Sequence, residues 1–101
     1  MKETEIMVIC AHEEILKTIV RLINNHPEMN ATGVSTLEQA VTVLKSAYFD
    51  LVLLGSGLSP EEEHEFSETV KHMRKKIPVV HHYGGGSGLL FTEIYEALER
   101  K

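Results

Sequence analysis

The chain alternates short apolar runs with longer stretches in which apolar residues recur every three or four positions. Compact runs occur at residues 6–10, 51–54 and 79–80, and a weaker one at residues 30–35. Runs of this length, flanked by polar or turn-forming residues, are typical of short strands in a buried parallel sheet. The run at 30–35 contains a glycine and little apolar mass, so we expect it at an edge of the sheet.

Each apolar run is followed by a segment with the helical period. Apolar stripes in residues 13–23, 37–47, 60–77 and 89–100 predict four helices. The third helix has the clearest start, because Ser59 is a typical cap, Pro60 suits the first helical position and acidic residues fill the first turn. Pro78 ends this helix.

Strand and helix therefore alternate four times with short connections. This order predicts an α/β domain of three layers, in which a parallel sheet has helices on both faces and right-handed crossovers. A chain of 101 residues is large enough for one hydrophobic core but not for two. We expect residues 1–101 to form a single domain.

Composition and charge narrow the classes of partner. The formal net charge of -5, from 15 acidic and 10 basic residues, argues against nucleic acid and anionic membranes, which require a basic face. No apolar stretch approaches the ~20 residues that span a bilayer, and the first residues lack the apolar core of a signal peptide. One cysteine cannot form an internal disulfide. These features predict a cytoplasmic protein.

Side chains that follow the strands provide one candidate site. In open α/β sheets, ligands bind at the carboxyl ends of the strands. The central strand ends at Gly55, which has no side chain, whereas the first brings Cys10 and His12 to this edge and the last brings His81 and His82. Cysteine and histidine are ligands for zinc and similar metals, so these four residues form a metal-binding or small-ligand hypothesis.

A glycine-rich loop before the last helix is a second candidate. Backbone N–H groups at a helix amino terminus attract anions, which suggests a phosphate-binding loop. No lysine follows the glycines, and the loop opens the last helix instead of the first, so it fits neither nucleotide motif. The alternative is a flexible crossover. The loop consists of Gly84, Gly85, Gly86, Ser87 and Gly88.

Over residues 4–84 and in the final helix, the chain resembles the receiver domains of two-component response regulators. The resemblance rests on the segments Glu5 to Leu16, Ser35 to Ala40, Asp50 to Leu54 and Ile77 to Val80. It implies a flavodoxin-like sheet in the strand order 2-1-3-4. A full receiver has a fifth strand before the last helix, and this chain has no room for that strand or for the helix that precedes it.

The functional positions of the receiver family are not matched. Receivers hold a divalent metal with two acids after the first strand, accept phosphate on an aspartate at the end of the third, and carry Thr or Ser after the fourth. Here these positions are occupied by Cys10 and Ala11, by Gly55 and by Tyr83. Phosphorylation needs carboxylates as nucleophile and as magnesium ligands. The resemblance therefore implies a pseudo-receiver that is not an enzyme, needs no cofactor and acts by binding protein.

A second family, the IIB subunits of sugar phosphotransferase systems, has a similar size and opening. These subunits carry a phosphocysteine just after the first strand, where Cys10 stands here. Their phosphate loop is rich in Gly, Ser and Thr, whereas this chain places Glu13 and Glu14 nearby, and two carboxylates repel a phosphoryl group. We retain phosphotransfer at Cys10 as an alternative to the receiver-like function.

Without a fifth strand, the fourth strand becomes an edge of the sheet. Val79 and Val80 on an uncovered edge favour association with another chain. We therefore expect a homodimer formed through the fourth strand and the last helix. Aromatic residues are common at interfaces, so Tyr83, Phe91 and Tyr95 are expected to contribute further contacts.

Overall fold

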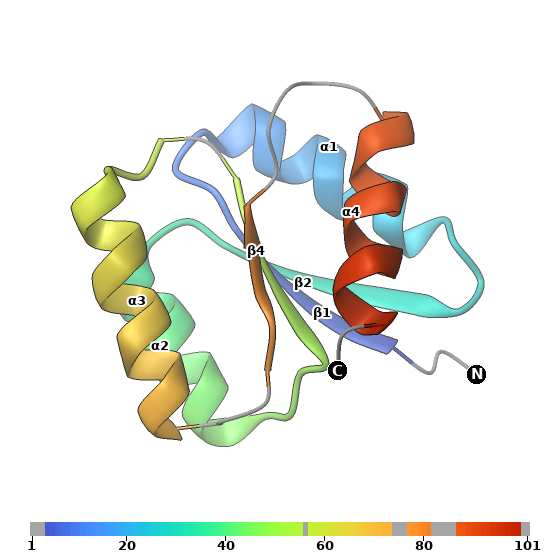
Figure 1. The fold of residues 1–101 in the computed structure, drawn as a ribbon. Coiled ribbons are helices and arrows are strands. Elements are labelled where there is room, and N and C mark those ends of the chain that lie inside the picture. The colour runs from blue at the N-terminus through green and yellow to red at the C-terminus, as the bar shows by residue number, and fades with distance from the viewer. Residues whose placement is uncertain (1–3, 56, 74–76, 82–86, 100–101) are drawn as a thin grey trace.

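Four strands and four helices alternate along the chain (Figure 1). The computed structural model describes residues 4–55, 57–73, 77–81 and 87–99. The predicted alternation is confirmed, and each element lies close to its expected position. The elements are β1 (Thr4–Ile9), α1 (Glu13–Asn24), β2 (Met29–Val34), α2 (Leu37–Ser46), β3 (Leu51–Leu54), α3 (Pro60–Met73), β4 (Val79–His81) and α4 (Ser87–Glu99).

The strands form one parallel sheet in the order β2-β1-β3-β4, which confirms the predicted topology. Within the described residues, no fifth strand pairs with β4. Ile9 is level with Val34 on one side and with Leu54 on the other, and Leu54 is level with His81. The carboxyl ends of all four strands therefore meet along one edge of the sheet.

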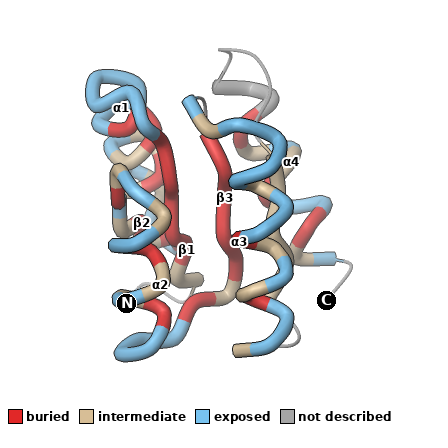
Figure 2. The backbone as a smooth tube through the Cα atoms, turned by 90° about the vertical axis from the view of Figure 1, so that its left-hand side faces the viewer, coloured by how far each residue is buried: buried red, intermediate tan, exposed pale blue. Residues whose placement is uncertain are grey.

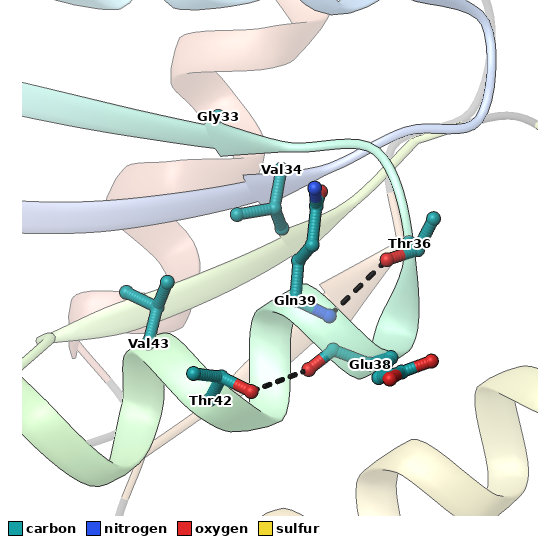
Figure 3. A pocket seen from close by; sticks show the side chains of 7 residues that line it. All are labelled: Gly33, Val34, Thr36, Glu38, Gln39, Thr42 and Val43. Carbon is teal, nitrogen blue, oxygen red and sulfur yellow. Dashed lines mark hydrogen bonds between the residues drawn. The ribbon is translucent and has the colours of Figure 1, made fainter.

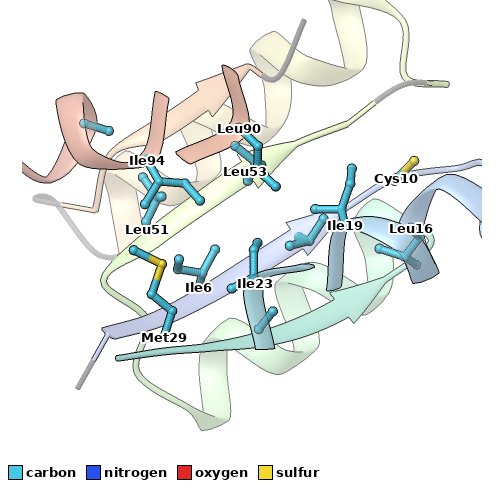
Figure 4. Packing of buried hydrophobic residues seen from close by; sticks show 13 residues of the cluster. Ile6, Cys10, Leu16, Ile19, Ile23, Met29, Leu51, Leu53, Leu90 and Ile94 are labelled. Carbon is cyan, nitrogen blue, oxygen red and sulfur yellow. The ribbon is translucent and has the colours of Figure 1, made fainter. Parts of the chain in front are cut away.

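Helices cover both faces of the sheet and enclose two separate cores. Helices α1 and α4 lie on one face, and α2 and α3 lie on the other (Figure 1). Successive strand residues point to opposite faces, so Val8 joins the α1 and α4 side while Met7 joins the α2 and α3 side. Both are fully buried, as are β1 and β3 along most of their length (Figure 2). The core on the α1 and α4 side is drawn in Figure 4.

The predicted edge position of the weak strand is confirmed, because β2 pairs only with β1 among the described strands. Its glycine has a packing role. A Cβ atom on Gly33 would lie 2.8 Å from Val20 Cγ2 and 3.1 Å from Leu16 Cδ1. Helix α1 thus packs close to the β2 backbone at this point.

In the described parts of the chain, no helix is long and apolar enough to cross a membrane.

The predicted start of α3 is confirmed by a reciprocal capping box. Ser59 Oγ accepts a hydrogen bond from the Glu62 backbone N–H at 3.1 Å, and Glu62 Oε1 accepts one from the Ser59 N–H at 2.9 Å. Each side chain thus satisfies a backbone donor that the helix leaves without an intrahelical partner.

Removing this cap should have a measurable effect on stability. We expect Ser59→Ala to lower the free energy of unfolding by about 1 kcal/mol, because the Glu62 backbone N–H loses its acceptor, Ser59 Oγ. Urea denaturation followed by circular dichroism measures this change. Ser67→Ala is the matched control in the same helix and should change stability by less than about 0.5 kcal/mol. Equal losses in the two variants would contradict a capping role for Ser59.

Candidate functional site

The carboxyl edge of the sheet is closed by direct packing between the loops that follow β1 and β3. Gly55, just after β3, is buried and donates its N–H to Ile9 O at 2.7 Å. A Cβ atom on Gly55 would lie 2.9 Å from Cys10 Cβ and 3.1 Å from Cys10 Sγ. Real Cβ atoms essentially never show a contact as short as the first of these, and the second is tighter than most. The side chain of Cys10 therefore occupies the space that a side chain at position 55 would need.

A second close approach joins the same two loops. Gly57 has a φ of +96°, in the left-handed region that favours glycine. A Cβ atom at this position would lie 2.5 Å from Ala11 Cβ. Both the backbone conformation and the contact thus require glycine. Gly57 was not among the residues predicted to form the site, although a glycine three residues beyond the end of a buried strand is a signal for such a turn.

Cys10 is enclosed in this packing. Its side chain is fully buried, and its thiol donates a hydrogen bond to His12 O at 3.4 Å. His12 is exposed and occupies the N-cap position of α1, where its side chain makes no capping hydrogen bond. The two residues that the sequence analysis grouped are therefore adjacent, and the sulfur contacts the backbone carbonyl of His12.

His81, at the end of β4, pairs with an acidic residue that the sequence analysis did not assign to the site. Its Nε2 contacts Glu63 Oε2 in the first turn of α3, and both side chains are partly buried. Helix α3 connects β3 to β4, so this pair ties the end of β4 to the start of the helix that leads into it. The contact could not be read from spacing, because it depends on how α3 is rotated over the sheet.

The metal hypothesis gains no support from this arrangement. Among residues 4–55, 57–73, 77–81 and 87–99, no three His, Cys, Asp or Glu side chains converge where they could hold a metal ion. Cys10 is buried beneath the loops, His12 is exposed, and His81 contacts Glu63. His82, the fourth predicted ligand, lies outside the described residues.

The glycine loop lies largely outside the described part of the chain. Gly84, Gly85 and Gly86 are not described, and neither is Tyr83, so the anion-loop hypothesis and the role of Tyr83 stay predictions. Ser87 and Gly88 form the first positions of α4. Five residues, 82–86, connect β4 to α4.

Four of the five predicted interface residues fall in the described part of the chain, on β4 and α4. Val79 and Val80 are half-buried on the edge strand β4. The two aromatic residues of α4 instead contact His26, in the turn between α1 and β2. The ring centroid of Phe91 lies 5.6 Å from that of His26, and Tyr95 Oη lies 2.8 Å from His26 Nε2. These side chains therefore reach toward the β2 side of the domain, away from β4.

The hydrogen bond between His26 and Tyr95 has a defined direction. His26 Nδ1 accepts a hydrogen bond from the Glu28 N–H at 3.2 Å, so in the neutral ring the proton is on Nε2. Nε2 then donates to Tyr95 Oη. This contact joins α4 to the turn after α1. It gives Tyr95 a partner within the domain, although Tyr95 is 44% exposed. Tyr95 thus has a structural role that the sequence analysis did not foresee.

An open depression lies beside the carboxyl end of β2 (Figure 3). Its polar groups are largely paired with one another: Thr36 Oγ1 accepts from the Gln39 N–H at 3.1 Å, and Thr42 donates to Glu38 O at 3.1 Å. Such pairing leaves few polar atoms directed at a ligand. The lining residues are Gly33, Val34, Thr36, Glu38, Gln39, Thr42 and Val43.

The outer face of α3 carries a carboxyl group whose pKa is displaced. The pKa of Glu68 is lowered by a hydrogen bond from Lys71, whose Nζ lies 3.2 Å from Glu68 Oε2, and by the positive charge of that lysine. His64 and His72 on the same exposed face add smaller effects in the same direction. This group of charges is in solvent and does not belong to the closed edge of the sheet.

Comparison with known proteins identifies the fold. No family model matches the sequence, and no curated protein does. A sensor protein from Polaromonas sp. JS666 superposes with a TM-score of 0.82 at 8% identity, over 96% of this chain and 97% of that chain. A response regulator receiver domain protein from Clostridium thermocellum gives 0.79 at 12% identity, over 96% and 95%.

A third similar structure is the response regulator protein TrrA from Thermotoga maritima in complex with Mg(2+)-BeF. It superposes with a TM-score of 0.77 at 12% identity, over 94% of this chain and 98% of that chain. The chain therefore has the flavodoxin-like fold of receiver domains, as its sequence pattern indicated.

Proposed function

We propose that this domain is a receiver-like protein-interaction module that is not phosphorylated on aspartate and catalyses no reaction of its own. The observation that carries the proposal is the contact between Gly55 and Cys10. In the receiver fold, position 55 is where the phosphoacceptor carboxylate belongs, and here a neighbouring side chain fills that space, with 2.9 Å between Cys10 Cβ and a Cβ atom on Gly55.

The carboxylates of the described chain support the same conclusion. Asp50 lies at the opposite end of β3, where its Oδ2 accepts a hydrogen bond from the Glu5 N–H at 2.8 Å. Glu63 reaches the carboxyl edge but contacts His81. Phosphoryl transfer to a carboxylate needs further carboxylates to hold magnesium against the transferring group. The residues after β1 that would supply them are Cys10 and Ala11.

Phosphotransfer through Cys10 is disfavoured by the surroundings of its thiol. The side chain is fully buried, so a phosphoryl donor has no direct access to the sulfur. The sulfur donates its proton to His12 O, which is an acceptor, whereas a bound phosphate would need donors. The buried thiol behaves as a small apolar residue of the core.

Incubation with acetyl phosphate and Mg²⁺, followed by intact-mass measurement, tests the proposal. We expect no phosphoryl adduct under conditions in which a receiver domain with its aspartate is modified, because position 55 offers no nucleophile. An adduct that hydroxylamine removes would identify a phosphorylated carboxylate and overturn the proposal. An adduct that is lost in Cys10→Ser would assign phosphotransfer to the cysteine instead.

A further inference from the structure

The edge of the sheet that β2 forms is occupied by groups of the same chain. Alternate residues of β2 point away from β1, and their N–H groups find acceptors in the neighbouring segments. The Met29 N–H donates to His26 O at 3.3 Å, and the Ala31 N–H donates to Asn24 Oδ1 at 2.8 Å. Just after β2, the Ser35 N–H donates to a glutamine side chain of α2 at 3.1 Å. These bonds hinder another strand from pairing along β2.

The opposite edge, formed by β4, is open. The Val52 N–H donates to Pro78 O at 3.0 Å, and a parallel ladder uses alternate residues, so Pro78 and Val80 face β3. The N–H and C=O of Val79 therefore point away from the sheet. Within the described residues, no group accepts from or donates to these two atoms. Strand β4 lies at the outside of the sheet, between α3 and α4 (Figure 1).

The residues of this edge are compatible with an identical strand. Residues 77–81 include no acidic residue, lysine or arginine. Edge strands of natural proteins commonly carry such charges, or a proline, which prevent pairing between copies. Pro78 lacks its N–H on the side that faces β3, so the outer row of backbone groups is intact. A second β4 strand beside the first would therefore meet neither like charges nor a missing donor.

An antiparallel register centred on Val79 makes the strand complementary to itself. Two residues that lie directly opposite in a hydrogen-bonded antiparallel pair exchange both backbone hydrogen bonds. With a two-fold axis at Val79, this residue lies opposite its own copy, and Val80 lies beside Pro78 of the second chain. Residues 77–80 are all half-buried in one chain. The second copy thus covers apolar surface that the missing neighbour of β4 leaves exposed.

The acidic side chains of the helices beside this edge have partners within the chain. Glu63 of α3 contacts His81 at the end of β4. Glu93 and Glu96 of α4 also have interactions of their own. Pairing at this edge therefore depends on the backbone groups and on the apolar side chains of residues 77–80, and it requires no charged group of the partner.

We propose that two copies of this chain pair antiparallel through β4, with a two-fold axis at Val79, and form one continuous sheet. The occupied β2 edges end this sheet on both sides, so assembly stops at a dimer and no filament forms. Phe91 and Tyr95 take no part, because they face His26. The inference goes beyond the proposed function, since the pairing does not depend on whether position 55 accepts phosphate.

Sedimentation velocity of the full chain over a series of concentrations measures the pairing. We expect the mass to rise from that of one chain to that of two, and no further. Hydrogen exchange in ¹⁵N-labelled protein locates the contact. Exchange at the Val79 amide should slow as the concentration rises, whereas exchange at the outward amide of Gly33 on β2 should not change.

Substitutions at the two-fold axis test the register. Val79→Lys alone and Val79→Glu alone each place like charges opposite one another, so each variant should self-associate about tenfold more weakly than the native chain. An equimolar mixture of the two variants places opposite charges in the pair and should restore the dimer. Val79→Thr is uncharged and similar in size, and this matched control should pair like the native chain.

Three results would overturn the inference. The first is the mass of a single chain at every concentration up to about 1 mM. The second is a mass that continues to rise beyond two chains, which would mean that the β2 edge is not closed. The third is a mixture of Val79→Lys and Val79→Glu that stays monomeric although circular dichroism shows both variants to be folded. None of these results involves phosphorylation, so this inference and the proposed function can each fail while the other stands.

Discussion

Replacing Gly55 with aspartate is expected to lower the free energy of unfolding by about 2–4 kcal/mol. The new Cβ atom would lie 2.9 Å from Cys10 Cβ and 3.3 Å from Ile9 O, so the loops after β1 and β3 must separate. The carboxylate would also enter a buried position beside the Cys10 side chain and the Ile9 carbonyl oxygen. Urea denaturation of the two proteins measures the loss.

His12→Asp is the control that places a carboxylate at the same edge without crowding. His12 is exposed at the N-cap of α1, where aspartate is among the preferred residues and the present side chain makes no cap. We expect this variant to be unchanged or more stable by up to about 1 kcal/mol. If Gly55→Asp and His12→Asp lowered the free energy of unfolding equally, charge at this edge and not packing would cause the loss.

The contact itself can be isolated by a double-mutant cycle. Cys10→Gly removes both atoms that a side chain at position 55 would meet on that residue, so Gly55→Ala should cost less in the Cys10→Gly background than in the native one. We expect a coupling free energy of about 1 kcal/mol. Additive effects would show that Cys10 does not occupy the space beside Gly55.

Truncating Ile94 to alanine is expected to lower the free energy of unfolding by about 3–4 kcal/mol. Its side chain is fully buried in the core between α4 and the sheet, where it lies near Leu51 and Leu53 of β3 (Figure 4). The same substitution at Ile15 of α1, where the side chain is 45% exposed, should change stability by less than about 1 kcal/mol. Chemical denaturation of the matched pair measures the difference.

This comparison tests how α4 is joined to the fold. Only residues 82–86 connect β4 to α4, and the helix must still cover the face that it shares with α1. A large loss in Ile94→Ala alone means that α4 unfolds cooperatively with the sheet. Similar small losses in both variants would mean that α4 contributes little to the stability of the sheet.

Much of the fold could be predicted because local signals agreed with the tertiary arrangement. The apolar run of β3 was long enough to require burial on both faces, and all four of its residues are buried. Ser59 and Pro60 marked the start of α3, and Ser59 caps the helix as expected. The strand order came from the resemblance to receivers, since periodicity alone does not determine which strands are neighbours.

The candidate site could be predicted only in part, because its contacts join segments that are distant in the sequence. The glycine at position 55 indicated a missing nucleophile, but not that Cys10 fills the space. The helical period of α4 identified Phe91 and Tyr95 as lateral residues without showing which neighbour they face. Their contact with His26 depends on the packing of α4 beside α1, and this placed them away from Val79.

The close packing of Cys10 against Gly55 also constrains how such a domain could change over evolutionary time. A substitution at position 10 and an aspartate at position 55 would have to arise in a fixed order. An aspartate gained at position 55 while Cys10 is present would destabilise the protein and be removed by selection, whereas a smaller residue must first appear at position 10.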